Sequence, residues 1–330
     1  MASGGIIDIS TGMAQTIGRY FSVVSVIPSS LYVIFVYVLI TSGSWEHSPN
    51  WGHAVKSLEQ LGVGGIAFLA FLSVALGVLI HPIQFAIVQF FEGYWGTSPF
   101  AQAIRARRIL RYQRLCQDLA EEQNRTQDQL VYFSRAGVRA PAVRTPLQSR
   151  LDETSRVIDT FPRGLSQIMP TRLGNALRRS ESNAGSQYGL NALQIVPQLL
   201  LIAPPGHVDY VNDQRSQLDL AVRMTFISAL ASATAVLFLW PYRLWVLVAV
   251  IPYVLAYLSY RGSVVAARLY GSALDTLINL DRFALYEQLR LQLPADTAGE
   301  RKTNEELARL FKYDDAVVLS YRRPDGAGGS

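Results

Sequence analysis

The sequence predicts an all-α, polytopic membrane protein with four transmembrane helices in two hairpins and a largely helical cytoplasmic domain. Two apolar blocks, 21–95 and 220–260, are separated by a long arginine-rich stretch that contains no comparable apolar run. Half of the 330 residues are hydrophobic and the mean hydropathy is +0.18, which is too apolar for an ordinary soluble domain. A membrane part and a separate polar part are therefore expected.

The first block holds two predicted spans. About 20 apolar residues, each rising ~1.5 Å, cross a hydrocarbon core of roughly 30 Å. Residues 21–42 carry no charge, and Pro28 lies near their start, where its missing N–H does least harm. Residues 61–91 are also without Asp, Glu, Lys or Arg, but one straight helix of that length would reach about 46 Å. The second span must therefore tilt, bend or protrude.

The second block holds the other two spans, 220–240 and 244–260. The residues between them, 240–243, place a proline between two aromatic side chains and beside an arginine. This composition is typical of a tight turn at the level of the lipid headgroups. The last two spans are therefore expected to form an antiparallel pair.

Basic residues accumulate on one side of the predicted spans. Residues 98–218 hold 16 arginines against 10 acidic residues, whereas 43–60 hold one lysine against two glutamates. The positive-inside rule therefore places both termini and both large polar regions in the cytoplasm. The predicted parts are a cytoplasmic N-terminus (1–20), a first transmembrane hairpin (21–97) with an outer loop (43–60), a basic cytoplasmic helical region (98–218), a second transmembrane hairpin (219–260), and a cytoplasmic stalk helix with a tail (261–330). Arginine far outnumbers lysine, which is typical of GC-rich bacterial genes, so a bacterial inner (plasma) membrane is the expected location.

A basic helix is predicted over 101–130, which is rich in helix formers and lacks Gly and Pro. Five arginines near its start are the candidate lipid- or partner-binding residues: Arg105, Arg107, Arg108, Arg111 and Arg114. Acidic residues follow later, and this gradient suits anionic headgroups, near which each basic residue contributes on the order of 1 kcal/mol. A protein partner and a merely solvated helix face are the alternatives, and the lack of base-reading groups disfavours nucleic acid.

Further short elements are predicted in the basic region. Two prolines in 137–148 indicate a linker, and Thr171 is a candidate N-cap for a helix over 172–180. The apolar run 190–203 is interrupted by Pro197 and is too short to span. It predicts a buried or interfacial helix, with a re-entrant segment as the alternative.

After the last span the helical pattern continues to Leu293, and Pro294 ends it, which predicts a continuous stalk. A polar helix is expected over 303–311 and a disordered tail over 326–330.

The second predicted span is interrupted by His81 and Pro82. Proline lacks the N–H that would bond the Val78 carbonyl, so a kink with a freed carbonyl is expected. A titratable side chain beside free backbone is a candidate for an intramembrane ion or proton path. The alternative is a position near the headgroups, as expected also for Glu92 and Arg223, which could pair across helices.

Motifs for catalysis, metal binding or nucleotide binding are missing from the sequence. His47, His53 and Glu46 match no recognised ligand set, and a single cysteine, Cys116, permits neither an intrachain disulfide nor a thiolate cluster. Neither a serine elbow nor a phosphate-cradling glycine loop occurs. The sequence therefore predicts no enzymatic activity, no cofactor and no metal site.

Two short patterns, RLGN at 172–175 and YGL at 188–190, are followed by a juxtamembrane helix over 271–293. In these features the chain resembles uncharacterised bacterial multi-pass membrane proteins. The resemblance covers about the second half of the chain and implies a shared cytoplasmic element beside the last helix pair, without implying an activity. Gly174 and Gly189 are expected to mark tight turns.

Two classes of function are compatible with this pattern. One is a membrane-anchored scaffold or signalling component whose cytoplasmic helices bind a partner. The alternative is an oligomeric channel, transporter or membrane-disrupting effector, with a path lined by His81, Pro82 and small residues. Few charged residues lie within the spans, which favours the first class, because ion pathways usually leave polar residues inside a bundle.

Pairs of small residues on the third span, Ser228 with Ser232 and Ala229 with Ala233, predict close helix packing within one chain or between chains. The expected partners are therefore a bilayer with anionic headgroups and either a protein partner or further copies of the chain.

Overall fold

The structure is a computed structural model that describes residues 21–136, 141–312 and 317–321. The described residues are 82% helical, and they form no strand apart from one isolated bridge between Leu291 and Tyr321. The predicted all-α class is confirmed. The predicted N-terminal segment, part of the linker and the tail lie outside the described residues.

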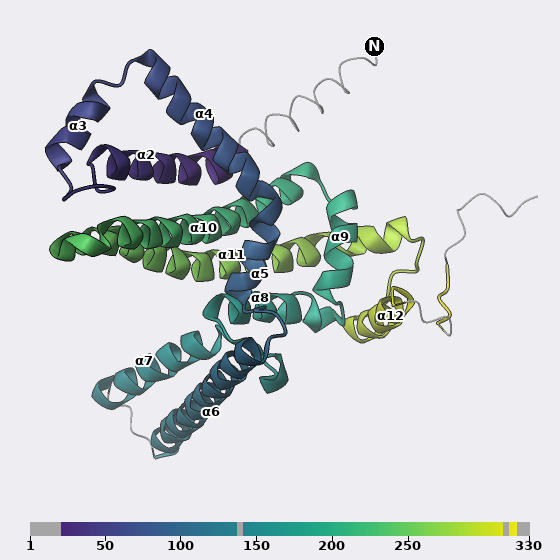
Figure 1. Ribbon diagram of the computed structural model, residues 1–330. Helices are drawn as coiled ribbons and strands as arrows, with labels where there is room; N and C mark the ends of the chain where they lie inside the picture. Colours follow the sequence, from purple (N-terminus) through teal and green to yellow (C-terminus); the bar gives the residue numbers. More distant parts are fainter. Residues whose placement is uncertain (1–20, 137–140, 313–316, 322–330) are drawn as a thin grey trace, which may run out of the picture. The chain divides into compact units, whose positions relative to one another are not determined.

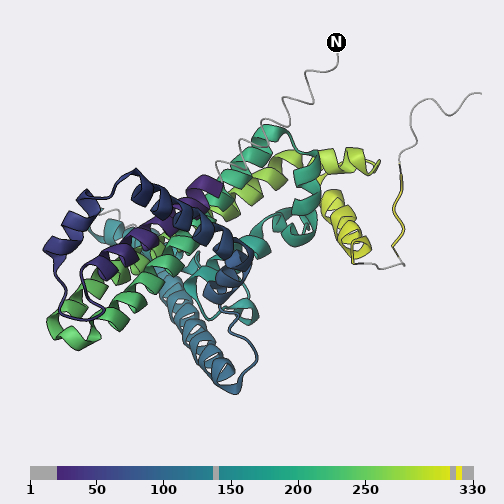
Figure 2. The same cartoon turned by 45° about the horizontal axis from the view of Figure 1, so that its top comes forward.

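Two compact units make up the fold (Figure 1, Figure 2). Unit 1 consists of Met1–Phe90 and Arg215–Ala266, and unit 2 consists of Phe91–Gln214 and Ala267–Ser330. Each unit is thus assembled from two segments that are far apart in the sequence.

Three helical segments among the described residues are long and apolar enough to cross a membrane: Val24–Thr41, Val63–Glu92 and Pro205–Gln288. A helix whose surface is mostly apolar cannot be hydrated favourably over that length, so it needs lipid or protein around it. The segments support a membrane-embedded protein.

The third segment is folded back on itself. It consists of α10 (Pro205–Leu239), the 3₁₀ stretch η5 (Trp240–Ala249) and α11 (Val250–Gln288). The backbone leaves helical geometry at Tyr242 and at Arg243, whose φ is +45°. Figure 1 and Figure 2 both show α10 and α11 side by side in opposite directions. The turn predicted between the last two apolar segments is therefore present.

The first apolar block begins with the π-helix η1 (Phe21–Val26) and continues as α2 (Ile27–Thr41). Pro28 is the second residue of α2, so its missing N–H falls at the transition from π to α geometry. The Ser29 hydroxyl donates to the Ser25 carbonyl at 2.8 Å and satisfies one backbone acceptor there.

After the segment 43–60, which contains α3 (Trp51–Glu59), the chain returns as α4 (Val63–Ile80). The 3₁₀ turn η2 (His81–Ile83) joins α4 to α5 (Gln84–Glu92), so the long second segment is not one uninterrupted α-helix. Its length is therefore divided at the place where the sequence predicts a break.

Aromatic contacts join the segment 43–60 to the turn between α10 and α11. The rings of Trp45 and Phe238 lie 5.5 Å apart, and those of Trp51 and Trp245 lie 5.6 Å apart. An apolar cluster beneath them contains Leu39, Ala235, Leu239 and Ala249. Both connections consequently lie at the same end of unit 1.

In unit 2, α6 (Pro99–Arg135) and α7 (Pro141–Ile158) form an antiparallel hairpin (Figure 1). The linker predicted over 137–148 is therefore wrong from Pro141 onward. Pro141 is the first helical residue, where an N–H has no intrahelical partner to lose, and Pro146 lies inside the helix.

The core of unit 2 is built around a short apolar helix. The elements that form the unit besides the hairpin are η3 (Leu165–Gln167), α8 (Arg172–Asn183), η4 (Ser186–Tyr188), α9 (Ala192–Ile202), α12 (Thr297–Leu310) and the adjoining part of α11. Ile195 and Leu199 of α9 are fully buried against Leu277 and Ile278 of α11 and Leu307 of α12. The run 190–203 thus provides the buried helix that was the first of its two predicted alternatives.

Several helix ends differ from the prediction, and two of the differences have a clear local cause. α11 ends at Gln288 rather than Leu293, because Arg290 adopts a left-handed φ of +54° and the Leu291 N–H bonds the Tyr286 carbonyl at 2.9 Å. α12 begins at Thr297, earlier than the predicted 303, because Asp296 caps it by accepting the Gly299 N–H at 2.7 Å.

Candidate functional site

The five arginines predicted to bind lipid or a partner lie on α6 but do not share one face. Arg107, Arg111 and Arg114 follow the i, i+4, i+7 spacing of a single helix face and are exposed. Phe100 and Leu110 on the same side of the helix are 76% and 53% exposed. This part of α6 therefore presents basic and large apolar side chains together.

The other two arginines lie beside aromatic rings. The guanidinium of Arg105 lies 6.0 Å from the centroid of Tyr94, and that of Arg108 lies 5.8 Å from the centroid of Trp95. These distances are at the limit of cation–π attraction. The aromatic pair directly follows the candidate span that ends at Glu92, and Tyr and Trp are typical of the membrane–water interface.

The opposite face of α6 packs within unit 2. The rings of Tyr112 and Phe161 lie 5.7 Å apart, and Gln123 Nε2 donates to Ser155 Oγ of α7 at 3.2 Å. Cys116 is half-buried on this face, and burial raises the pKa of its thiol, which favours the protonated form at neutral pH. One face of α6 therefore packs within unit 2, and the opposite face is exposed and could contact lipid or a partner.

His81 and Pro82, the candidate path residues, are both exposed. The predicted freed carbonyl is wrong, because the Val78 carbonyl accepts the His81 N–H within the tighter turn. Pro82 thus changes the local hydrogen bonding from the α-helical to the 3₁₀ pattern, and the Val78 carbonyl still has a donor. A role in an ion path stays a prediction.

A buried arginine lies inside unit 1. Arg223 of α10 has no exposed surface, and its Nε donates to Gln84 Oε1 at 2.8 Å. The Gln84 Nε2 in turn donates to the Asp219 carbonyl at 3.3 Å. The sequence indicated Arg223 as a charge near a span end, but it gave no sign of Gln84, which is uncharged and 139 positions away.

The RLGN pattern has a physical basis at the start of α8. Thr171 Oγ1 accepts the Gly174 N–H at 2.9 Å, which confirms the predicted N-cap, and donates to the Glu92 carbonyl at 2.8 Å. A Cβ on Gly174 would lie 2.1 Å from that carbonyl oxygen. The Asn175 side chain accepts the Met169 N–H at 2.7 Å and donates to the Met169 carbonyl at 2.9 Å. Gly174 therefore permits a close backbone approach and does not mark a turn, in contrast to the prediction.

Glycines are also important in the YGL pattern at 188–190 and at the start of the juxtamembrane helix over 271–293. Gly189 has a left-handed φ of +75° and does mark the tight turn that was predicted. A Cβ on Gly271 of α11 would lie 2.0 Å from Ser180 Oγ of α8. The crossing of these two helices therefore requires a residue without a side chain.

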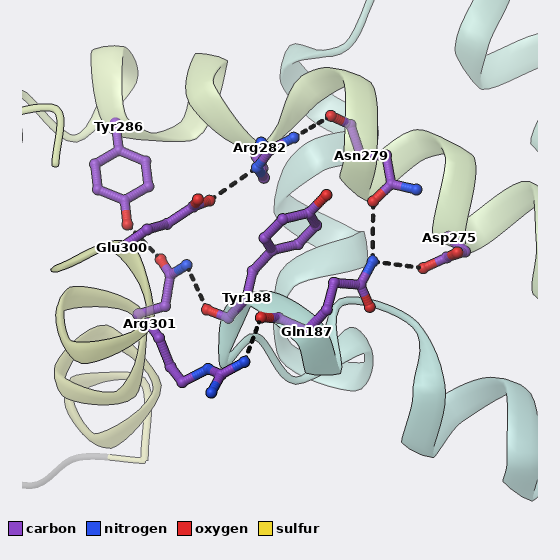
Figure 3. Close-up of polar contacts among 9 residues, drawn as sticks. Gln187, Tyr188, Asp275, Asn279, Arg282, Tyr286, Glu300 and Arg301 are labelled. Atoms are coloured by element: carbon purple, nitrogen blue, oxygen red, sulfur yellow. Dashed lines mark hydrogen bonds and ion pairs between the residues drawn. The ribbon is translucent and has the colours of Figure 1, made fainter. Parts of the chain in front are cut away.

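A polar network joins η4, α11 and α12 (Figure 3). Arg282 Nε donates to Glu300 Oε1 at 2.8 Å, and the guanidinium lies 4.1 Å from the Tyr188 ring centroid. The Tyr286 hydroxyl donates to Asn304 Oδ1 at 2.6 Å, and Asn304 Nδ2 donates to the Tyr188 carbonyl at 2.9 Å. Since Glu300 and Asn304 are buried, the network fixes α12 to the unit.

A second polar contact holds the start of α10. The Nδ1 of His207 lies 2.9 Å from Oδ2 of Asp281, which is buried. The sequence did not single out either residue, because each is polar and isolated in its own segment.

One of the two small-residue pairs predicted on the third span packs against other parts of the same chain. Ser228 is buried, and the Ser232 hydroxyl donates to the Ala249 carbonyl at 2.9 Å. Ala229 and Ala233 are exposed. Intrachain packing thus accounts for the first pair and leaves the second on the surface.

Comparisons with family models, with curated proteins and with solved structures found no match to this chain. The resemblance to uncharacterised bacterial multi-pass membrane proteins therefore stays a prediction.

Proposed function

We propose that the protein is a membrane-anchored scaffold or signalling component of a bacterial inner membrane. In this proposal four spans form two hairpins, α2 with α4–α5 and α10 with α11, and both termini lie in the cytoplasm. The aromatic contacts between the outer loop and the α10–α11 turn support this topology, because two hairpins whose turns lie at the same end of unit 1 can both cross a membrane and return. The arginine excess of 98–218 supports a cytoplasmic unit 2.

The observation that carries the proposal is the exposed face of α6. Arg107, Arg111 and Arg114 provide planar donors that match lipid phosphates, and Phe100 and Leu110 provide apolar surface that can enter the headgroup region. Together they suit a leaflet that contains anionic lipid. With α6 against the headgroups, unit 2 is held at the membrane surface.

The partner surface in this proposal is the outer face of α12. Glu300, Asn304 and Leu307 face the core, which leaves Lys302 and Glu305 exposed. Mixed charges of this kind favour a protein partner over a lipid surface, because they provide no net positive field.

Co-purification tests the scaffold function. The full-length chain, extracted in mild detergent, is expected to retain one protein in constant ratio. That protein should be lost from a Lys302→Glu, Glu305→Lys variant, which leaves the buried face of α12 unchanged. A preparation that contains only the chain itself, at physiological salt and from several growth conditions, contradicts the proposal.

A further inference from the structure

A polar pocket of about 630 Å³ lies within unit 2, and the proposed scaffold function makes no use of it. Residues of α8, η4, α11 and α12 line it, together with the segment that follows α7. The charged lining residues are Asp159, Arg163, Arg179, Arg268, Asp275 and Arg301. Four arginines against two aspartates leave a net charge of +2 at the pocket.

Part of this lining is fixed by hydrogen bonds. Arg179 Nη2 donates to Asp159 Oδ1 at 2.5 Å, and its Nη1 donates to the Phe161 carbonyl at 2.8 Å. Arg301 Nη2 donates to the Gln187 carbonyl at 2.9 Å. These arginines are thereby held in position, and the charge of Asp159 is already matched.

The remaining positive charges are available. Arg163 and Arg268 are exposed at the pocket, and neither forms an ion pair with a described residue. An arginine pair of this kind binds an anion in two-pronged fashion, because each guanidinium presents parallel N–H groups.

The pocket lining also contains a side-chain oxygen that lacks a hydrogen-bond donor, which favours a ligand that can supply one. Asn183 lines the pocket, and its Oδ1 atom is buried without a hydrogen-bond partner among the described residues. A buried acceptor left unpaired is costly, so a ligand hydroxyl that donates to it would be bound favourably. Ser272, also in the lining, can donate to a ligand oxygen, whereas the Ser180 hydroxyl already donates to the Ala176 carbonyl at 2.9 Å and can only accept.

We propose that this pocket binds a small phosphate ester that also carries a hydroxyl group. The phosphate lies between Arg163 and Arg268, and the hydroxyl donates to Asn183. A pocket of this volume is in the range that holds a small ligand and is too small for a folded partner. The net charge of +2 matches a phosphate monoester dianion better than a single carboxylate.

Two sources can supply this chemistry, namely a soluble sugar or glycerol phosphate and the headgroup of a phospholipid. The binding site does not depend on the scaffold function, because none of its charged residues lies on the exposed face of α6.

Binding of glycerol 3-phosphate to the full-length chain tests the proposal. Isothermal titration is carried out with the protein in phosphatidylcholine nanodiscs. We expect saturable binding that becomes at least about tenfold weaker in Arg163→Gln and in Arg268→Gln, since each removes one charge-assisted contact. Asp275→Asn should bind more tightly, because it removes a negative charge and keeps the oxygen that accepts the Gly185 N–H.

Arg172→Gln is the matched control, because Arg172 is exposed on α8 and does not line the pocket. Its affinity should equal that of the wild type. An equal loss in Arg172→Gln, or no saturable binding by the wild type, overturns the proposal.

The lipid composition then distinguishes the two sources. In discs with phosphatidic acid, a headgroup that occupies the pocket would weaken the apparent binding of glycerol 3-phosphate relative to discs with equally charged phosphatidylglycerol. Equal affinities in the two kinds of disc assign the pocket to a soluble phosphate ester.

Discussion

Arg282 Nε lies 2.8 Å from Glu300 Oε1, and this ion pair joins α11 to α12 inside unit 2. The two side chains are only 15% and 4% exposed. Glu300→Gln leaves the guanidinium without its charged partner in a poorly hydrated place, a change that typically costs about 3–5 kcal/mol. We predict that α12 becomes less protected from amide hydrogen exchange in this variant.

The double variant Arg282→Met, Glu300→Leu is the control for that prediction. Replacing both charges by apolar groups of similar volume removes the desolvation cost as well as the attraction. Its α12 should be better protected than that of Glu300→Gln. Equal loss of protection in the two variants would show that the charge pair is not the cause.

Gly174→Ala should destabilise the protein. Its Cβ would meet the Glu92 carbonyl oxygen at 2.1 Å, and that oxygen is fixed by the Thr171 hydroxyl, so the backbone must shift. Gly262→Ala is the matched change, because a Cβ there has no neighbour within 4 Å and Ala is the better helix former by about 0.5–1 kcal/mol. Thermal unfolding in detergent is expected to show a lower Tm for the first variant and an unchanged or higher Tm for the second.

The stability of unit 2 should depend on pH through Glu181. Burial raises the pKa of this carboxyl, and the neighbouring Arg178 opposes the shift. Because the folded pKa lies above the unfolded one, the ionised group costs stability, and the cost grows as pH rises from the unfolded value through the folded one. Glu181→Gln should therefore raise Tm relative to the wild type at pH 8 and have little effect at pH 4. A gain that is the same at both values would refute this assignment.

The break at His81 and Pro82, the N-cap at Thr171 and the reversal near Arg243 could be predicted from the sequence, because each depends on local backbone chemistry. Proline lacks a donor and threonine supplies a capping oxygen wherever they occur. The freed Val78 carbonyl was predicted wrongly, since a local rearrangement to 3₁₀ geometry gives that acceptor a new donor.

The contacts that hold distant segments together could not be predicted in this way. Gln84 and Arg223 meet only because α5 and α10 pack side by side, and Gly174 meets the Glu92 carbonyl only because α8 begins there. The linker prediction is wrong because Pro141 lies at the first position of α7 and Pro146 is tolerated inside it, where packing on α6 stabilises the helix. The pocket residues come from five separate segments, none of which carries a recognisable ligand-binding motif.

The four-span topology predicts a simple pattern of labelling. In a Cys116→Ser background, single cysteines at the exposed positions Ser48→Cys and Pro241→Cys should react with a membrane-impermeant maleimide in intact cells. Ser166→Cys and Ala298→Cys, exposed in unit 2, should react only after permeabilisation. Protection of Pro241→Cys in intact cells would mean that α10 and α11 do not both cross.

The depth of α6 at the membrane surface tests the central claim most directly. A spin label on Leu110→Cys, in a Cys116→Ser background, reports contact with oxygen in lipid or with a nickel chelate in water. In nanodiscs with anionic lipid we predict that the label is accessible to oxygen, and that joint replacement of Arg107, Arg111 and Arg114 by glutamine returns it to water. A label on Asn124→Cys, farther along the helix, is the control and should stay in water throughout. A Leu110 label that is equally accessible to the nickel chelate with anionic and with zwitterionic lipid would contradict the account.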